Sequence, residues 1–192
     1  MARTVEFNEE EAVQKAMQVF WEKGYNGASM RDLTAAMQIN SSSLYNTIGD
    51  KQQLFFKCID HYTHTRLVAA QQQAAGTASP LQAIIDIING SAQTIAHSSH
   101  SCLGIKTAFE VASTDTAVRA LLQKHDDDFL DLLQRLIKRA IRQGELRAEE
   151  DPEMLADFIF NAFTGWHESF ILHGNPVKIK KMASYLVAQI TK

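Results

Sequence analysis

Residues 29–45 read SMRDLTAAMQINSSSLY, and this stretch decides how the rest of the chain is interpreted. Leu33 and Met37 lie four residues apart and predict the apolar face of a short helix. Asn40 is a typical helix N-cap, and Ser41–Ser43 place hydroxyls where a core helix would carry apolar side chains. Two short helices joined this tightly, the second with a polar N-terminal end, are typical of a helix-turn-helix that enters the DNA major groove.

Two kinds of DNA contact are expected from these residues. The caps Ser29 and Asn40 leave helix N–H groups for phosphate, Lys51 brings a charge, and Tyr45 offers its hydroxyl while its ring packs inward. Arg31 and the polar groups of the second helix are candidates for base edges, helped by DNA shape because serine hydroxyls pair with either base type. The expected DNA-binding set is Ser29, Arg31, Asn40, Ser41, Ser42, Ser43, Tyr45, Asn46 and Lys51.

Composition alone does not predict a nucleic-acid partner. The formal net charge of the 192 residues is −3, and residues 1–65 hold six Lys or Arg against eight Asp or Glu, although DNA-binding domains are usually basic. No apolar run approaches the roughly 20 residues that cross a bilayer, and no signal peptide is recognisable. Cys58 and Cys102 fall in different contexts and predict no disulfide. We expect a cytoplasmic protein with no membrane partner and no cofactor.

Nearly the whole chain is predicted to be helical. Pro80, Pro152 and Pro176 each follow a residue that caps helices, which is the usual order at a helix start. Gly24 is expected to end the first helix. The expected helices cover residues 8–24, 29–37, 40–48, 51–75, about 80–96, 102–112, 116–143, 152–173 and 176–190.

Several spaced motifs resemble the TetR family of bacterial transcription regulators. They are AMQVF at 16–20 with Gly24-Tyr25, SMRDLTA at 29–35, SLY at 43–45 and DKQQL at 50–54, and Cys102-Leu103, Gly144-Glu145-Leu146 and Asp151-Pro152 look like one branch of the family. Two positions depart from the usual pattern: Gln38 replaces a turn glycine, which predicts mild backbone strain, and Ile48 replaces an aromatic residue. The resemblance implies an all-α chain with a three-helix helix-turn-helix domain at 1–50, a linking helix at 51–75, and an effector-binding and dimerisation domain at 76–192.

The resemblance also implies a homodimeric regulator of a palindromic operator on double-stranded DNA, in which a small-molecule effector releases a repressor. Aromatic side chains with a few polar groups suit such a ligand, and the expected set is Phe109, Glu110, Phe129, Phe158, Asn161, Trp166, His167 and Phe170. The last two helices are apolar on more than one side, which favours burial against a second subunit. The residues expected there are Phe160, Thr164, Met182 and Leu186.

Other interpretations stay open at this stage. A thiol-based redox sensor through Cys102 is one, because a nearby imidazolium or helix N-terminus stabilises a thiolate. His97, His100 and Cys102 have the residue types of a metal site but lack further ligands, so no metal is assigned. A helical interaction module without DNA binding fits the acidic N-terminal part. No catalytic residues are assigned, because no nucleophile–base pair, phosphate loop or carboxylate pair is recognisable, and an enzyme is not expected.

Overall fold

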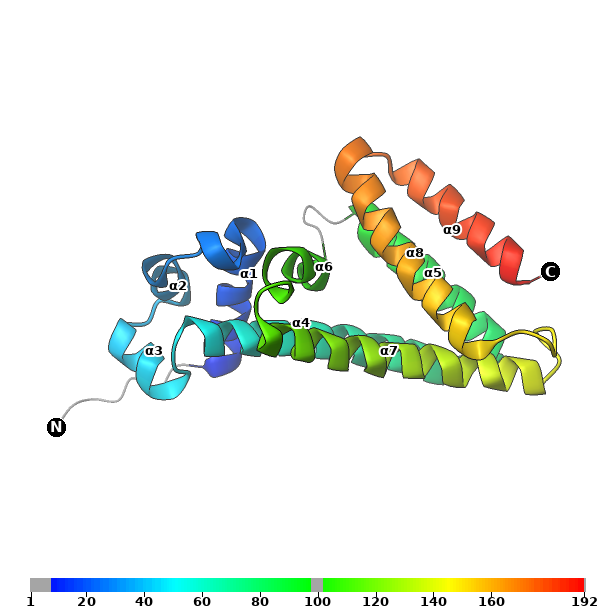
Figure 1. Cartoon of the computed structure of the whole chain (residues 1–192), viewed down its shortest axis with the longest axis horizontal. Coiled ribbons are helices and arrows are strands. Elements are labelled where there is room, and N and C mark those ends of the chain that lie inside the picture. The colour runs from blue at the N-terminus through cyan, green and yellow to red at the C-terminus, as the bar shows by residue number, and fades with distance from the viewer. Residues whose placement is uncertain (1–7, 98–101, 192) are drawn as a thin grey trace. The chain divides into compact units, whose positions relative to one another are not determined.

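The computed structural model describes residues 8–97 and 102–191, and every regular element in these ranges is a helix. The all-α prediction is therefore confirmed. Figure 1 shows the elements in chain order: α1 (Glu9–Gly27), α2 (Met30–Met37), α3 (Ser41–Thr47), α4 (Lys51–Ala75), α5 (Pro80–His97), α6 (Leu103–Thr107), the π-helix η1 (Ala108–Ala112), α7 (Thr116–Arg142), α8 (Pro152–His173) and α9 (Pro176–Ile190).

The described residues form two compact units. The first takes the chain up to His64 together with Leu103–Gln123, and the second takes Thr65–His97, Cys102 and the residues from Lys124 onward. The helices α4 and α7 each supply residues to both units. The sequence-based division placed residues 76–192 in the C-terminal domain, whereas residues 103–123 pack with the N-terminal helices.

Local capping explains where the helices of the first unit begin. The Asn8 side chain accepts from Glu11 N at 3.2 Å. Ser29 and Asp32 form a reciprocal capping box, with Asp32 N donating to Ser29 Oγ at 3.1 Å and Ser29 N to Asp32 Oδ2 at 3.0 Å. Asn40 Oδ1 accepts from Ser43 N at 2.7 Å. These caps confirm the expected starts of the first three helices.

Two local expectations differ from the structure. Gly24 does not end α1: its φ of 75° and ψ of 171° interrupt the helical backbone, and a further turn continues to Gly27. The short helix expected at 102–112 is α-helical only over α6, and the chain then continues as the π-helix η1. Segments of π-helix are uncommon and are frequent at functional positions.

In the second unit, α5 packs against α8 and α9; in Figure 1 it lies behind α8. Proline begins each of these three helices, as expected, and Asp151 and Asn175 cap α8 and α9. The core is a continuous apolar cluster that includes the fully buried side chains Ile84, Ile88, Leu133, Ile137 and Ile159. No helix in the described ranges is both long enough and apolar enough to cross a membrane.

Candidate nucleic-acid interface and effector region

The connection between α2 and α3 consists of Gln38, Ile39 and Asn40. Gln38 is left-handed, with φ 58° and ψ 36°, and is the one non-glycine residue of positive φ in the described ranges. Its N–H donates to Ala35 O at 3.3 Å, and Ile39 N donates to Thr34 O at 3.2 Å, which closes the turn. The predicted strain at Gln38 is confirmed, because its Cβ crowds the backbone in this conformation.

The recognition-helix candidate α3 separates its faces cleanly. Leu44 and Ile48, one helical turn apart, are buried in the core. The opposite side carries Ser41, Ser42, Asn46 and Thr47, all exposed, with Ser43 half-buried. Hydroxyl and amide groups therefore face outward on a short helix, which is the arrangement that base and phosphate contacts require.

The expectation that the Tyr45 ring packs inward was wrong. Its side chain is 55% exposed, because Leu44 already occupies the core-facing position and the next residue is rotated about 100° around the helix. The hydroxyl and the ring are both accessible. Asn40 and Ser29 use their side chains as the N-caps of α3 and α2.

Lys51, the first residue of α4, lies over an aromatic ring. Its Nζ is 4.6 Å from the ring centroid of Tyr25, within the range of a cation–π contact. Burial, followed by the charges of Asp115 and Asp50, raises the pKa of the Tyr25 phenol, so the ring stays neutral. The contact places the ammonium group beside the Tyr25 ring at the start of α4. Sequence reasoning selected Lys51 but missed Tyr25 as its partner.

Several acids of the first unit are paired with lysines. Lys15 lies 2.7 Å from Glu11 and Lys23 2.6 Å from Asp32, and Lys57 pairs with Glu9. The hydrogen bonds from Lys23 and then Ser29 hold the pKa of Asp32 well below its usual range. Each pair joins one acid to one lysine, so the excess of acids in this part of the sequence is unchanged and these three lysines are already engaged within the unit.

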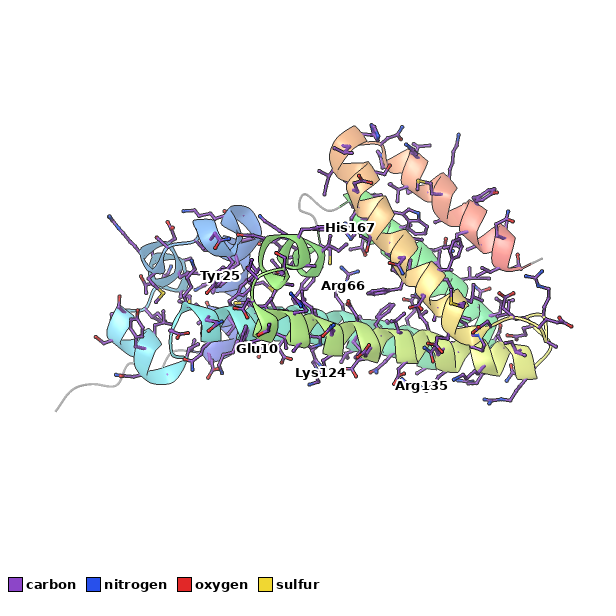
Figure 2. The ribbon with its side chains drawn as sticks, in the orientation of Figure 1. Glu10, Tyr25, Arg66, Lys124, Arg135 and His167 are labelled. Carbon is purple, nitrogen blue, oxygen red and sulfur yellow. The ribbon has the colours of Figure 1, made fainter. Side chains whose placement is uncertain are left out.

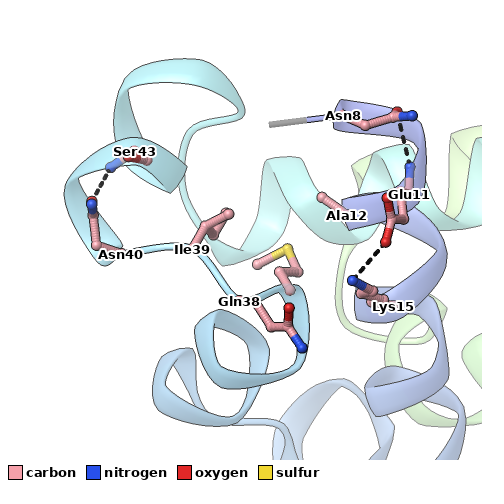
Figure 3. Close-up of a pocket in the computed structure, with 9 residues that line it drawn as sticks. Asn8, Glu11, Ala12, Lys15, Gln38, Ile39, Asn40 and Ser43 are labelled. Atoms are coloured by element: carbon pink, nitrogen blue, oxygen red, sulfur yellow. Dashed lines mark hydrogen bonds and ion pairs between the residues drawn. The ribbon is translucent and has the colours of Figure 1, made fainter. Parts of the chain in front are cut away.

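A cavity of about 330 Å³ lies between the start of α1 and the α2–α3 turn (Figure 3). Its labelled lining includes Asn8, Glu11, Lys15, Gln38 and Asn40. Ser43 also lines it, so two members of the expected DNA-binding set border this space. The polar lining adjoins the N-terminal end of α3.

Six of the eight expected ligand residues belong to the second unit. Phe129 lies 5.6 Å from Phe160 and 6.5 Å from Phe163, which in turn lies 5.4 Å from Trp166, between ring centroids. These rings form a connected aromatic cluster, and Phe170 packs against the hydrophobic core of the same unit. Phe158 is 61% exposed, and Asn161 is exposed and donates to Asp157 O at 2.9 Å.

The other two expected ligand residues belong to the first unit. Phe109 is 80% exposed there. The Glu110 carboxylate accepts hydrogen bonds from the backbone N–H groups of Tyr25 and Asn26, at 3.2 and 2.8 Å. Its oxygens are therefore engaged with α1, a role that sequence reasoning did not detect.

A polar group lies within the second unit at His167. Its side chain is only 5% exposed, and burial, followed by the charge of Arg66, lowers the pKa of its imidazole to about 4 (Figure 2). Arg66 Nη1 also donates to Cys102 Sγ at 3.8 Å. His100 lies outside the described residues, and the described residues contain no cluster of three candidate metal ligands.

A largely apolar groove of about 450 Å³ runs between α8 and α9. Phe158, Trp166, Met182, Tyr185 and Leu186 line it, with lysines at the rim. Of the four expected dimer residues, Met182 and Leu186 border this groove, whereas Phe160 packs against Phe129 and Thr164 is half-buried. Exposed apolar area of this kind on a helix pair is typical of an interaction surface.

Comparisons with known proteins agree with this geometry. The sequence profile "Bacterial regulatory proteins, tetR family" matches residues 12–58, and "Tetracyclin repressor-like, C-terminal domain" matches residues 77–186. The uncharacterised HTH-type transcriptional regulator YezE of Bacillus subtilis (strain 168) is 28% identical over 162 residues, covering 83% of this chain and 84% of the relative. The HTH-type transcriptional repressor DhaR of Mycobacterium sp. (strain GP1) is 26% identical over 161 residues, covering 80% and 77%.

A solved structure shows the same architecture. A cysteine mutant of the TetR family transcriptional regulator CifR, complexed with 26-bp double-strand operator DNA, superposes with a TM-score of 0.86 at 25% identity, covering 97% of this chain and 98% of that one. The helix-turn-helix, the second helical unit and both family profiles lead to one conclusion. The chain belongs to the TetR family of bacterial regulatory proteins.

Proposed function

We propose that this protein is a homodimeric transcriptional repressor that binds a palindromic operator and is released by a small-molecule effector. The observation that carries the DNA-binding part is α3, with Leu44 and Ile48 buried and Ser41, Ser42, Tyr45 and Asn46 directed outward. A similar chain, CifR, is complexed with operator DNA. The site of action follows from this role, because a regulator of bacterial genes works in the cytoplasm where the chromosome lies. No enzymatic activity is proposed.

The expected DNA-binding residues are proposed to have three roles: phosphate contact, base contact and orientation of the helices. Lys51 and the Tyr45 hydroxyl are proposed to contact phosphates, which sets position and salt dependence. Arg31 and Asn46 are exposed and are proposed to read base edges, since guanidinium and amide groups form bidentate pairs with guanine and adenine. Ser41, Ser42 and Ser43 add hydroxyl contacts, and the capping residues Ser29 and Asn40 orient the two helices.

A second copy of the chain is proposed to cover the α8–α9 groove. A two-fold axis there brings the same apolar surface of each protomer together, including Met182 and Leu186. Two α3 helices then face successive major grooves about 34–36 Å apart, or a distorted version of that spacing. An effector acts by favouring a dimer whose α3 spacing does not match the DNA. This requires that the effector bind that dimer more tightly than the one that fits the operator.

The effector is proposed to bind beside the aromatic cluster of the second unit. Phe129, Trp166 and Phe170 supply apolar surface, and neutral His167 offers both a donor and an acceptor nitrogen. Phe109 and Glu110 are left out of this proposed site, because they belong to the other unit.

A thiol signal is the second candidate for the effector step. The hydrogen bond from Arg66 to the Cys102 sulfur favours it, because a guanidinium stabilises a thiolate. Cys102→Ser separates the two modes: a thiol sensor loses its response to oxidant, whereas a ligand-gated repressor still responds to its ligand. Cys58→Ser is the matched control, since this thiol is fully buried.

Fluorescence anisotropy with duplexes selected from a random pool tests the proposal. We expect salt-dependent binding to a palindrome, weakened for all duplexes in the Tyr45→Phe/Lys51→Ala double variant, with the slope of log K against log salt reduced by about 1 for each phosphate that the variant no longer neutralises. Lys57→Ala is the control, because it removes the same charge from the same helix at a residue paired with Glu9. No salt-dependent binding to any duplex would instead favour an interaction module.

A further inference from the structure

The segment that follows Cys102 makes polar contacts with α1 at the place where Gly24 interrupts it. Lys106 Nζ donates to the carbonyl oxygen of Trp21 at 2.8 Å. Four residues later, Glu110 Oε2 and Oε1 accept from the N–H groups of Tyr25 and Asn26, at 3.2 and 2.8 Å. The two side chains therefore bind α1 on both sides of the interruption.

The signs of these charges match the backbone groups that they meet. The interruption of α1 at Gly24 leaves carbonyl oxygens before it, and N–H groups after it, without helical partners. A lysine suits the first and a carboxylate suits the second, for the same reason that cations and anions favour opposite helix ends. Glu110 also lies very close: a Cβ on residue 24 would be 2.6 Å from its Oε2.

The same segment reaches the start of α4. Asp115 Oδ2 accepts from Gln52 Nε2 at 2.7 Å, and Gln52 is the neighbour of Lys51. The Lys51 ammonium itself lies over the ring of Tyr25, whose backbone N–H Glu110 binds. The Lys51 ammonium thus lies against the Tyr25 ring, and the side chain of its neighbour Gln52 is held by Asp115.

We infer that Glu110, together with Asp115, is a positioning residue for DNA binding, which holds Tyr25 and Gln52 so that Lys51 meets the phosphate backbone. The inference rests on the proposed function. Neither carboxylate touches DNA in this scheme: Glu110 acts through the 25–26 backbone and Asp115 through a side-chain amide. Their effect on affinity is therefore opposite to that of an ordinary acid near DNA, whose charge repels phosphate.

The direction of the change in DNA affinity therefore distinguishes a positioning acid from an ordinary one. Glu110→Gln keeps the size of the side chain but turns one acceptor into a donor that faces an N–H, so we expect duplex affinity about tenfold weaker than wild type. Glu22→Gln is the control, because it removes an exposed charge from the same end of α1. The control should bind equally or slightly tighter, because the amide keeps an oxygen that can accept from Gln18 Nε2 while the negative charge is lost.

A double-mutant cycle with Lys51→Ala tests whether Glu110 acts on DNA affinity through Lys51. In a Lys51→Ala background, Glu110→Gln should add less than about a twofold loss, because the group that it positions is already missing. Affinity of Glu110→Gln equal to or above wild type, or losses that multiply fully with Lys51→Ala, would overturn the inference while leaving operator binding intact. If wild-type protein binds no duplex, the proposed function fails and this inference fails with it.

A second variant keeps the test decisive if Glu110→Gln loses its fold, which circular dichroism and, in a Trp166→Phe background, Trp21 fluorescence report. Gln52→Ala removes only the hydrogen bond to Asp115 and leaves a good helix former in α4. Weaker binding with a smaller contribution of Lys51 supports the positioning role, and unchanged binding overturns it.

Discussion

Replacement of Gly24 by alanine is expected to destabilise the first unit through two separate effects. The backbone of Gly24 has φ 75° and ψ 171°, a region that is almost restricted to glycine and that costs other residues about 1–3 kcal/mol. The new Cβ would also lie 2.6 and 2.8 Å from the two Glu110 carboxylate oxygens. The carboxylate must move, which breaks its bonds to Tyr25 and Asn26 and costs about 1–2 kcal/mol, since water reaches the exposed Asn26. The expected total is about 2–5 kcal/mol.

Urea unfolding followed by Trp21 fluorescence measures this loss. The chain has two tryptophans, so a Trp166→Phe background leaves one reporter in the first unit. Protein concentration is held fixed because dimerisation contributes to stability. Gly27→Ala is the matched control: its Cβ would meet only Lys23 Cβ, at 3.7 Å, and alanine is the better helix former, so no loss is expected.

A double-mutant cycle separates the two effects. In a Glu110→Ala background no carboxylate is displaced, so Gly24→Ala should cost about 1–2 kcal/mol less than it does in the wild type. The reasoning is refuted if Gly24→Ala unfolds at the wild-type urea concentration, or if its cost is the same with and without Glu110.

Other substitutions test separate features of the structure. Gln38→Gly should stabilise the first unit by up to about 1 kcal/mol in the same urea assay, because glycine adopts the left-handed backbone without strain, and a loss would contradict the turn geometry. The pKa of His167 is lowered from 6.5 to about 4, so the unfolded chain binds the extra proton between these values, and the free energy of unfolding should fall as pH drops from about 6.5 to 4. His167→Gln should flatten that slope, and an unchanged slope would rule out this histidine. Burial raises the pKa of the Cys58 thiol, so maleimide labelling followed by mass spectrometry should modify half-buried Cys102 well before Cys58, and equal rates in native protein would argue against the packing of α4.

The features that the sequence determined by itself are local. A cap and the N–H that it accepts lie three residues apart, as for Asn8, Ser29 and Asn40, so residue types at fixed spacing locate the helix starts. Proline directly after a capping residue marked three further helix starts, which is also a local signal. The strained turn at Gln38 was predicted from the resemblance to the family, in which this position is usually a glycine.

Other features depend on pairs of residues far apart in the chain, and these could not be predicted from local sequence patterns. Glu110 and Tyr25 are separated by 85 residues, and Gln52 and Asp115 by 63, and neither distance leaves a periodic or local signal. Residues 103–123 join the N-terminal helices because of such contacts. The exposure of Tyr45 was also undetermined, because two adjacent apolar residues, Leu44 and Tyr45, compete for one core position and the surrounding helices select between them.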